Sequence, residues 1–100
     1  MNPFKRISVA DAQQLLNQKD CLLLDYRDPQ SYRAAHVENA LNVHEALVQD
    51  LIANGDKAQP LVIYCYHGNS SQQFAAMMAE VGFNEVYSVD GGFESWKFRL

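Results

Sequence analysis

The chain has 100 residues and a formal net charge of -4; 48% of its residues are hydrophobic and 20% are charged. These values fit one globular domain spanning residues 1–100 and exclude a disordered chain. No apolar run reaches the ~20 residues that a membrane span needs, and the basic residues do not cluster as they do in general nucleic-acid binders.

The expected helices and strands alternate along the chain. In the first half of the chain we expect a helix from Ser8 through Leu16, a strand at 21–24, a short helix after Asp28-Pro29 and a strand at 40–43. A helix through Ala46, Leu47, Leu51 and Ile52 follows and stops at Asn54-Gly55. In the second half we expect a strand at 61–64, a helix at 71–81 ended by Gly82, a strand at 86–89 and a short terminal helix. The strands are short apolar runs, whereas the helices repeat apolar residues at helical spacing. Ser8 and Asp11 form the pattern of a capping box at the first helix.

This alternation predicts an α/β fold with a mainly parallel central sheet and helices on both faces. In such sheets, ligands bind at the carboxyl ends of the strands. The residues that follow three of the expected strands are Asp25 with Arg27, Cys65, and Asp90 with Gly91. We therefore expect these three segments to meet at one edge of the sheet.

The most informative segment is the loop Cys65-Tyr66-His67-Gly68-Asn69-Ser70-Ser71, which joins a predicted strand to a predicted helix. Free backbone N–H groups and the helix dipole would favour an anion in such a turn, either a thiolate or a charged substrate. The alternative is a small buried cysteine that only packs, which is the commoner fate of a cysteine.

From about Ile7 to Trp96 the chain resembles the single-domain rhodaneses, and among them the GlpE type of thiosulfate sulfurtransferase. The matching segments are residues 22–28, Ala35-His36-Val37, the Cys65 to Ser71 loop and residues 87–96. The resemblance implies the same α/β fold. It also implies that Cys65 is the nucleophile and carries sulfur as a persulfide, and that Asp25 and Arg27 brace the site through an ionic contact. The local departures are Ala35 in place of a common glycine, and Glu38-Asn39 in place of a Pro-Gly pair.

To accept sulfur, Cys65 must be a thiolate, yet a free thiol with a pKa of about 8.5 is mostly protonated at neutral pH. We expect the backbone N–H groups of the loop to lower this pKa and to bind substrate. The predicted substrate-binding residues are Tyr66, His67, Gly68, Asn69, Ser70 and Ser71. Gly68 allows a tight turn, and Ser70 and Ser71 offer hydroxyl donors or a helix cap. Many rhodaneses carry arginines in this loop, whereas this loop has none, so we expect no strong side-chain grip on a sulfonate. His67 either replaces part of that charge or faces solvent.

The remaining candidates are assigned structural roles. Cys21 is expected to be a packed thiol that forms no disulfide with Cys65, and Phe93 and Trp96 are expected in the core. The three histidines lack ligand spacing, so we expect no metal and no cofactor. The N-terminus, Met1 to Arg6, lacks the apolar stretch of a secretory signal, and we expect a cytoplasmic protein.

The leading hypothesis is a two-step transfer of sulfur from thiosulfate, through a Cys65 persulfide, to cyanide or to a dithiol acceptor such as thioredoxin. One alternative is a dual-specificity cysteine phosphatase, since such enzymes share the rhodanese fold. They need an arginine six residues after the cysteine, and Ser71 stands there. The other alternative is a non-catalytic rhodanese docking module; such modules commonly lose the cysteine that this chain retains.

Overall fold

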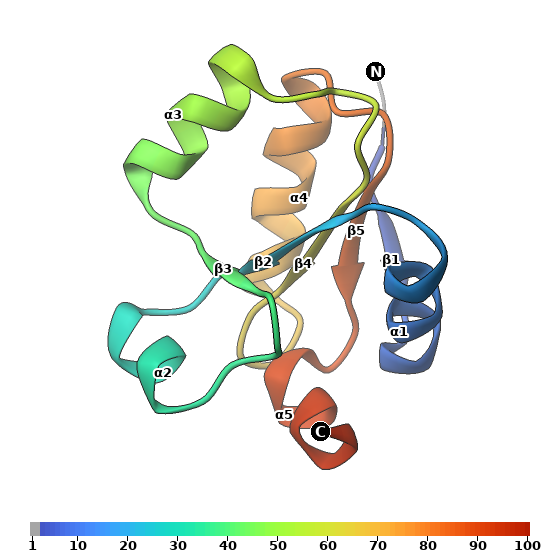
Figure 1. Cartoon of the computed structure of the whole chain (residues 1–100), viewed down its shortest axis with the longest axis vertical. Coiled ribbons are helices and arrows are strands. Elements are labelled where there is room, and N and C mark those ends of the chain that lie inside the picture. The colour runs from blue at the N-terminus through green and yellow to red at the C-terminus, as the bar shows by residue number, and fades with distance from the viewer. Residues whose placement is uncertain (1–2) are drawn as a thin grey trace.

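The computed structural model describes residues 3–100 and shows a five-stranded parallel sheet with helices on both faces (Figure 1). Met1 and Asn2, the first two residues of the predicted domain and of the N-terminal segment, lie outside the described residues. The strands are β1 (Lys5–Ile7), β2 (Leu22–Asp25), β3 (Leu41–Asn42), β4 (Leu61–Tyr64) and β5 (Val86–Val89). The helices are α1 (Val9–Gln18), α2 (Pro29–Ala34), α3 (Glu45–Asn54), α4 (Ser70–Glu80) and α5 (Gly92–Trp96), followed by a 3-10 turn at Lys97–Arg99. The predicted α/β fold is confirmed.

The strands lie in the order β1-β5-β4-β2-β3, and every neighbouring pair is parallel. This order places β4 at the centre, where its four residues are all buried, consistent with the apolar run that predicted it. The sequence reading missed β1. That edge strand begins with the exposed Lys5 and Arg6 and pairs only with β5, so it has no apolar run to reveal it.

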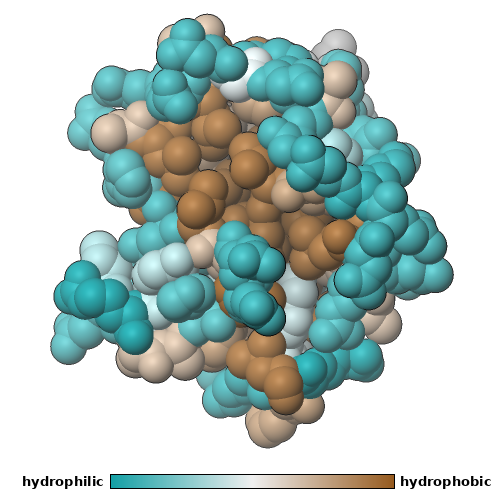
Figure 2. Space-filling view, in the orientation of Figure 1, coloured by the Kyte–Doolittle hydropathy of each residue, from teal (hydrophilic) through white to brown (hydrophobic). Residues whose placement is uncertain are grey.

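Two hydrophobic cores lie on opposite faces of the sheet. Leu24 and Ile63 belong to the core formed with residues of α3 and α4, whereas Leu23 and Val62 belong to the core formed with residues of α1 and α5. Figure 1 shows these two pairs of helices on either side of the sheet. This alternation follows from the period of two along a strand. Figure 2 shows apolar side chains gathered on the face that carries α3, where half-buried residues such as Leu47 and Val48 pack against the first core.

The helix termini largely follow the sequence signals. The Ser8 hydroxyl accepts a hydrogen bond of 3.1 Å from the backbone N–H of Asp11 and caps α1. Asp28 caps α2 ahead of Pro29, and α3 ends at Asn54 as predicted. Asn39 has φ of 70°, and asparagine is among the few residues that adopt this conformation readily. Within residues 3–100, no helix combines the length and apolar character needed to cross a membrane.

Candidate active site

Cys65 follows the last residue of β4 at the carboxyl edge of the sheet, and only 1% of its surface is exposed. Its Sγ atom accepts hydrogen bonds from the backbone N–H groups of Gly68, at 3.2 Å, and Ser71, at 3.3 Å. The Ser71 Oγ atom lies 3.2 Å from the same sulfur. The loop therefore wraps its donors around the sulfur, as the predicted turn requires.

These contacts set the ionisation of the thiol. Burial alone would raise the pKa of Cys65, because it disfavours the charged thiolate. The Ser71 hydroxyl and the N–H groups of Ser71 and Gly68 act against burial and leave the pKa below its usual value. The backbone of His67 adds to the same effect. Neutral donors alone thus outweigh the cost of burying the sulfur.

Ser70 and Ser71 were expected to act either as hydroxyl donors or as a helix cap, and the structure separates these roles. Helix α4 begins at Ser70, one residue earlier than predicted, and the cap position falls on Asn69, whose side chain makes no capping hydrogen bond. Of the two predicted alternatives, the N-cap role is therefore wrong for both serines, whereas the hydroxyl contact is present for Ser71. The Ser71 side chain turns inward to the sulfur instead, and it is fully buried.

Ser88 of β5 is a residue that sequence reasoning missed. Its Oγ atom lies 2.8 Å from the Oγ atom of Ser71, and both side chains are fully buried. The contact extends the polar surroundings of Cys65 to a neighbouring strand. A signal was present, because Ser88 is a polar residue in an otherwise apolar strand at a position that faces α4.

The segment that begins at Gly91-Gly92 supports the loop through backbone hydrogen bonds. The backbone N–H of Phe93 donates to the carbonyl oxygen of Cys65 at 2.8 Å, and the N–H of Glu94 donates to that of Tyr66 at 3.1 Å. A Cβ atom on Gly92 would lie only 2.6 Å from the Cys65 carbonyl oxygen, so no side chain fits there. The expected meeting of the segments after β4 and β5 is therefore present.

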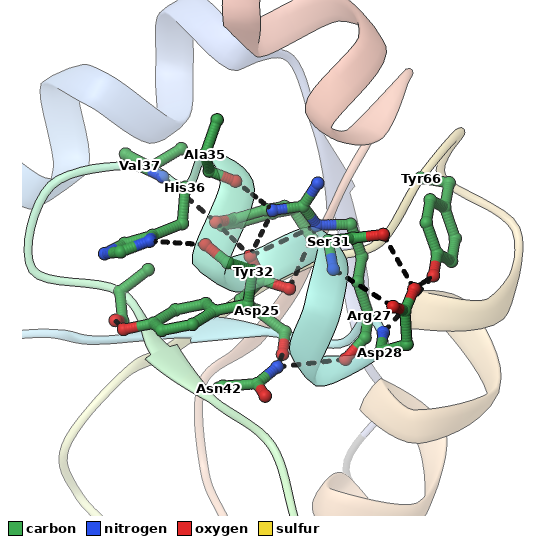
Figure 3. A network of polar contacts seen from close by, with 12 residues as sticks. Asp25, Arg27, Asp28, Ser31, Tyr32, Ala35, His36, Val37, Asn42 and Tyr66 are labelled. Carbon is green, nitrogen blue, oxygen red and sulfur yellow. Dashed lines mark hydrogen bonds and ion pairs between the residues drawn. The ribbon is translucent and has the colours of Figure 1, made fainter.

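Asp25 and Arg27 form a buried ion pair beside this loop (Figure 3). The Nη2 atom of Arg27 lies 2.8 Å from Oδ2 of Asp25, and their side chains are 5% and 0% exposed. The same Nη2 atom donates to the carbonyl oxygen of Ala35 at 2.6 Å. This geometry is that of the predicted brace.

Tyr64 completes the brace and was not singled out in the sequence. Its hydroxyl donates to Asp25 at 2.5 Å and accepts from the backbone N–H of Val37 at 3.1 Å. Burial and then the hydrogen bond to Asp25 raise the pKa of Tyr64 far above its usual value, so the phenol stays protonated. Because Tyr64 directly precedes Cys65, the brace fixes the strand end from which the loop departs.

Aromatic rings cover the guanidinium of Arg27. Its Cζ atom lies 4.2 Å from the ring centre of Phe93, and 5.7 and 5.9 Å from those of Tyr64 and Tyr66. Phe93 is half-buried and packs on this cation, while Trp96 is 1% exposed and lies in the core, as expected. The charge of Arg27 is thus used inside the protein.

The other loop side chains face outward. Tyr66, His67, Asn69 and Ser70 are exposed, whereas Gly68 is buried. The Tyr66 hydroxyl contacts the carboxylate of Asp28 and accepts from its backbone N–H at 3.2 Å, which ties the loop to the start of α2 (Figure 3). The ring of His67 makes no hydrogen bond to any described residue, in line with the solvent-facing alternative.

Cys21 lies apart from this site, at the amino end of β2. It is half-buried, its Sγ atom lies 3.9 Å from the Leu15 carbonyl oxygen, and both cysteines are free thiols. Burial is the main cause that raises the pKa of Cys21, the opposite direction from Cys65. In residues 3–100, no three His, Cys, Asp or Glu side chains gather as the ligands of a metal ion would.

Comparison with known proteins decides the family. The model of the rhodanese-like domain matches residues 8–99. The chain belongs to the rhodanese-like family. This rhodanese-like chain is 45% identical to the thiosulfate sulfurtransferase GlpE of Coxiella burnetii over 94 residues, which are 94% of the chain and 88% of that protein. It is also 45% identical to the GlpE of Ectopseudomonas mendocina over 97 residues, 97% of the chain and 88% of that protein.

Solved structures share the rhodanese-like fold. The rhodanese-like domain of an Anabaena protein aligns with a TM-score of 0.81 at 22% identity, covering 99% of this chain and 76% of that one. A Rhodopseudomonas palustris protein described as a possible tyrosine phosphatase also aligns with a TM-score of 0.81, at 21% identity, covering 96% of this chain and 81% of that one. At such identities, the likeness concerns the fold alone. The resemblance seen in the sequence is confirmed by the family match and by the curated relatives.

Proposed function

We propose that this chain is a thiosulfate sulfurtransferase in which Cys65 carries the transferred sulfur. The observation that carries the proposal is a buried sulfur atom held by two backbone N–H groups and one hydroxyl at the start of α4. The curated relatives at 45% identity over nearly the whole chain are named for this activity. Such close similarity over one domain supports a shared reaction.

In the first step, the Cys65 thiolate attacks the outer sulfur of thiosulfate. A new S–S bond forms to Cys65, the S–S bond of thiosulfate breaks, and its electron pair leaves with sulfite. The N–H groups of Gly68 and Ser71 stabilise the negative sulfur before the attack. The remaining loop residues assigned to substrate binding are Tyr66, His67, Asn69 and Ser70. All four present exposed side chains before or at the start of α4.

In the second step, a nucleophile attacks the outer sulfur of the persulfide and restores the Cys65 thiolate. Cyanide serves as this acceptor in an assay, and a dithiol such as that of thioredoxin serves in the cell. Turnover through free thiols requires a reducing compartment, which supports a cytoplasmic location. No step needs a metal or a cofactor, since the sulfur atom is transferred between nucleophiles.

The two alternatives lack comparable support. A phosphatase would need a positive side chain to clamp the phosphate, and positions 66 to 71 hold no arginine. A docking module would have no use for a lowered thiol pKa, yet the loop and Ser71 lower that of Cys65. The activated thiol therefore favours catalysis.

The test is intact mass after incubation with thiosulfate, followed by mild reduction. We expect one added sulfur atom on the protein, lost on reduction, and no added sulfur on Cys65→Ser, which should also lack thiosulfate:cyanide transfer because a serine hydroxyl is not ionised at neutral pH. Cys21→Ala is the matched control and should gain the sulfur normally. Turnover by Cys65→Ser above background would refute the assignment.

A further inference from the structure

The buried contact between Ser71 and Ser88 constrains where their hydrogen atoms point. A thiolate only accepts hydrogen bonds, so when Cys65 is ionised the Ser71 hydroxyl donates its single hydrogen to the sulfur, 3.2 Å away. The Ser71 Oγ atom can then only accept along its 2.8 Å contact with Ser88. Ser88 is the donor in the thiolate state.

The burial of Ser88 favours the same direction. Its side chain is fully buried, and among residues 3–100 its only side-chain hydrogen bond is the one with Ser71. If Ser88 accepted instead, its own hydrogen would be buried without an acceptor, and the sulfur would lose its hydroxyl donor. Donation by Ser88 satisfies its hydrogen and leaves the Ser71 hydrogen to the sulfur.

We propose that Ser88 is a positioning residue for Cys65: by donating to Ser71, it holds the Ser71 hydroxyl in the orientation that stabilises the thiolate. This rests on the proposed role of Cys65 as the nucleophile. A hydroxyl that accepts one hydrogen bond also becomes a stronger donor in the next, so Ser88 strengthens the bond it orients. Ser88 acts on the sulfur only through Ser71.

Charged groups around the sulfur do not replace this contact. Those on the segments packed around it are Arg27, Asp28, Tyr66, His67, Asp90 and Glu94. In the described residues, none of these side chains forms a hydrogen bond with Cys65, Ser71 or Ser88, and Asp25 with Tyr64 is engaged in the brace. A substitution at Ser71 or Ser88 therefore tests the effect of this hydroxyl pair on the Cys65 thiolate.

The experiment is a pH titration of thiolate absorbance in the ultraviolet. For each variant, the absorbance of the same protein carrying Cys65→Ser is subtracted, so that only the Cys65 thiolate is measured. Removing the direct donor in Ser71→Ala should raise the thiol pKa by about one unit or more, the size expected for a hydrogen bond to a charged group. Ser88→Ala should raise it by roughly half a unit, since it weakens that bond without removing it. In the double variant, Ser88→Ala should add no further shift to Ser71→Ala.

The direction of the change in the thiol pKa also predicts how catalysis depends on pH. Because the thiolate fraction falls as the pH drops through the pKa, a higher pKa moves the acid limb of kcat/KM to higher pH. For Ser88→Ala, activity well below the pKa should fall about threefold and recover in alkaline solution. A fold defect alone would lower activity at every pH without moving the limb.

Two results would overturn the role of Ser88: an unchanged thiol pKa in folded Ser88→Ala, or an equal shift in the background that lacks the Ser71 hydroxyl. If Ser88→Ala does not fold, Ser88→Cys, which is slightly larger and a weaker donor, should move the acid limb of kcat/KM in the same direction, and an unmoved limb would refute the role. Absence of sulfur uptake by the unmodified protein would refute the proposed function, whereas the titration would still decide what Ser88 does.

Discussion

Two buried polar networks meet the strand end at Cys65, and they are made of different groups. The network beside β2 contains a full ion pair between Asp25 and Arg27, joined by a phenol hydroxyl from Tyr64. The network around the sulfur contains only N–H groups and the hydroxyls of two serines. The ion pair thus fixes the geometry of the site, while neutral donors set the ionisation of the thiol. Breaking each network should therefore give a different phenotype.

The largest effect is expected from breaking the charged network. Arg27→Ala leaves the carboxylate of Asp25, which is fully buried, without its cation. Losing one partner of a buried pair costs about 3–5 kcal/mol, and the remaining hydrogen bond from Tyr64 favours the lower end. We expect a large fall in melting temperature with slower sulfur transfer, measured by thermal unfolding and steady-state kinetics.

Arg33→Ala is the matched control, because Arg33 is an exposed arginine on α2, the helix that follows the brace. It should change the free energy of unfolding by less than about 0.5 kcal/mol. If Arg27→Ala kept its melting temperature and lost all activity, Arg27 would be a direct substrate ligand, and the division of labour between the two networks would be wrong.

A smaller effect is expected from adding a positive charge next to the neutral network around the sulfur. Ser70 is exposed at the first position of α4, and the thiosulfate dianion meets no arginine in this loop. The KM for thiosulfate should accordingly lie near the millimolar end of the usual range. Ser70→Arg should lower KM by roughly two- to fivefold, corresponding to the ~0.5–1 kcal/mol of an exposed charge pair, and the gain should shrink as salt is raised.

Gln73→Arg adds the same charge at an exposed position one turn further along α4 and serves as the control for net charge. Its effect on KM should be much weaker. An unchanged KM in folded Ser70→Arg would mean that the loop geometry excludes a side-chain clamp, and that thiosulfate is not the donor for which this site is shaped.

The smallest effect is expected at the second cysteine, which belongs to neither network. Cys21→Ala removes a half-buried thiol at the opposite end of β2 from Asp25, so activity should be unchanged and stability should fall by at most about 1 kcal/mol. The measurements are kcat/KM and thermal unfolding. Loss of turnover by a folded Cys21→Ala protein would call for a mechanism with a resolving thiol.

The sequence predicted what depends on apolar patterning. The buried apolar runs at β2, β4 and β5, which alternate with helices, predicted a parallel sheet. That sheet in turn predicted that Asp25, Cys65 and the Gly91 segment lie at one edge. The sequence did not predict β1, which has two exposed charged residues and whose only strand neighbour among the described residues is β5. Edge strands of this kind are defined by their neighbour rather than by their own composition.

The site was predictable as a cysteine loop but not as a hydrogen-bonded network. Ser70 and Ser71 are both good capping residues. Only their positions around the axis of α4 distinguish them, because Ser71 faces the sulfur whereas Ser70 faces solvent. Tyr64 and Ser88 join the site across neighbouring strands, and such pairing depends on register between segments distant in the chain. One polar residue within an apolar strand was the available signal for Ser88.

The support given to the loop by Gly92, Phe93 and Glu94 has a consequence for the order in which the protein is assembled. In an unfolded chain a cysteine has an ordinary pKa of about 8.5 and is mostly a protonated thiol at neutral pH. The carbonyl groups of Cys65 and Tyr66 acquire their backbone partners only when the residues after β5 have docked. During synthesis those residues follow Cys65 by more than twenty positions. The thiol thus stays weakly reactive in a partly made chain, and its chemical reactivity develops together with the native fold.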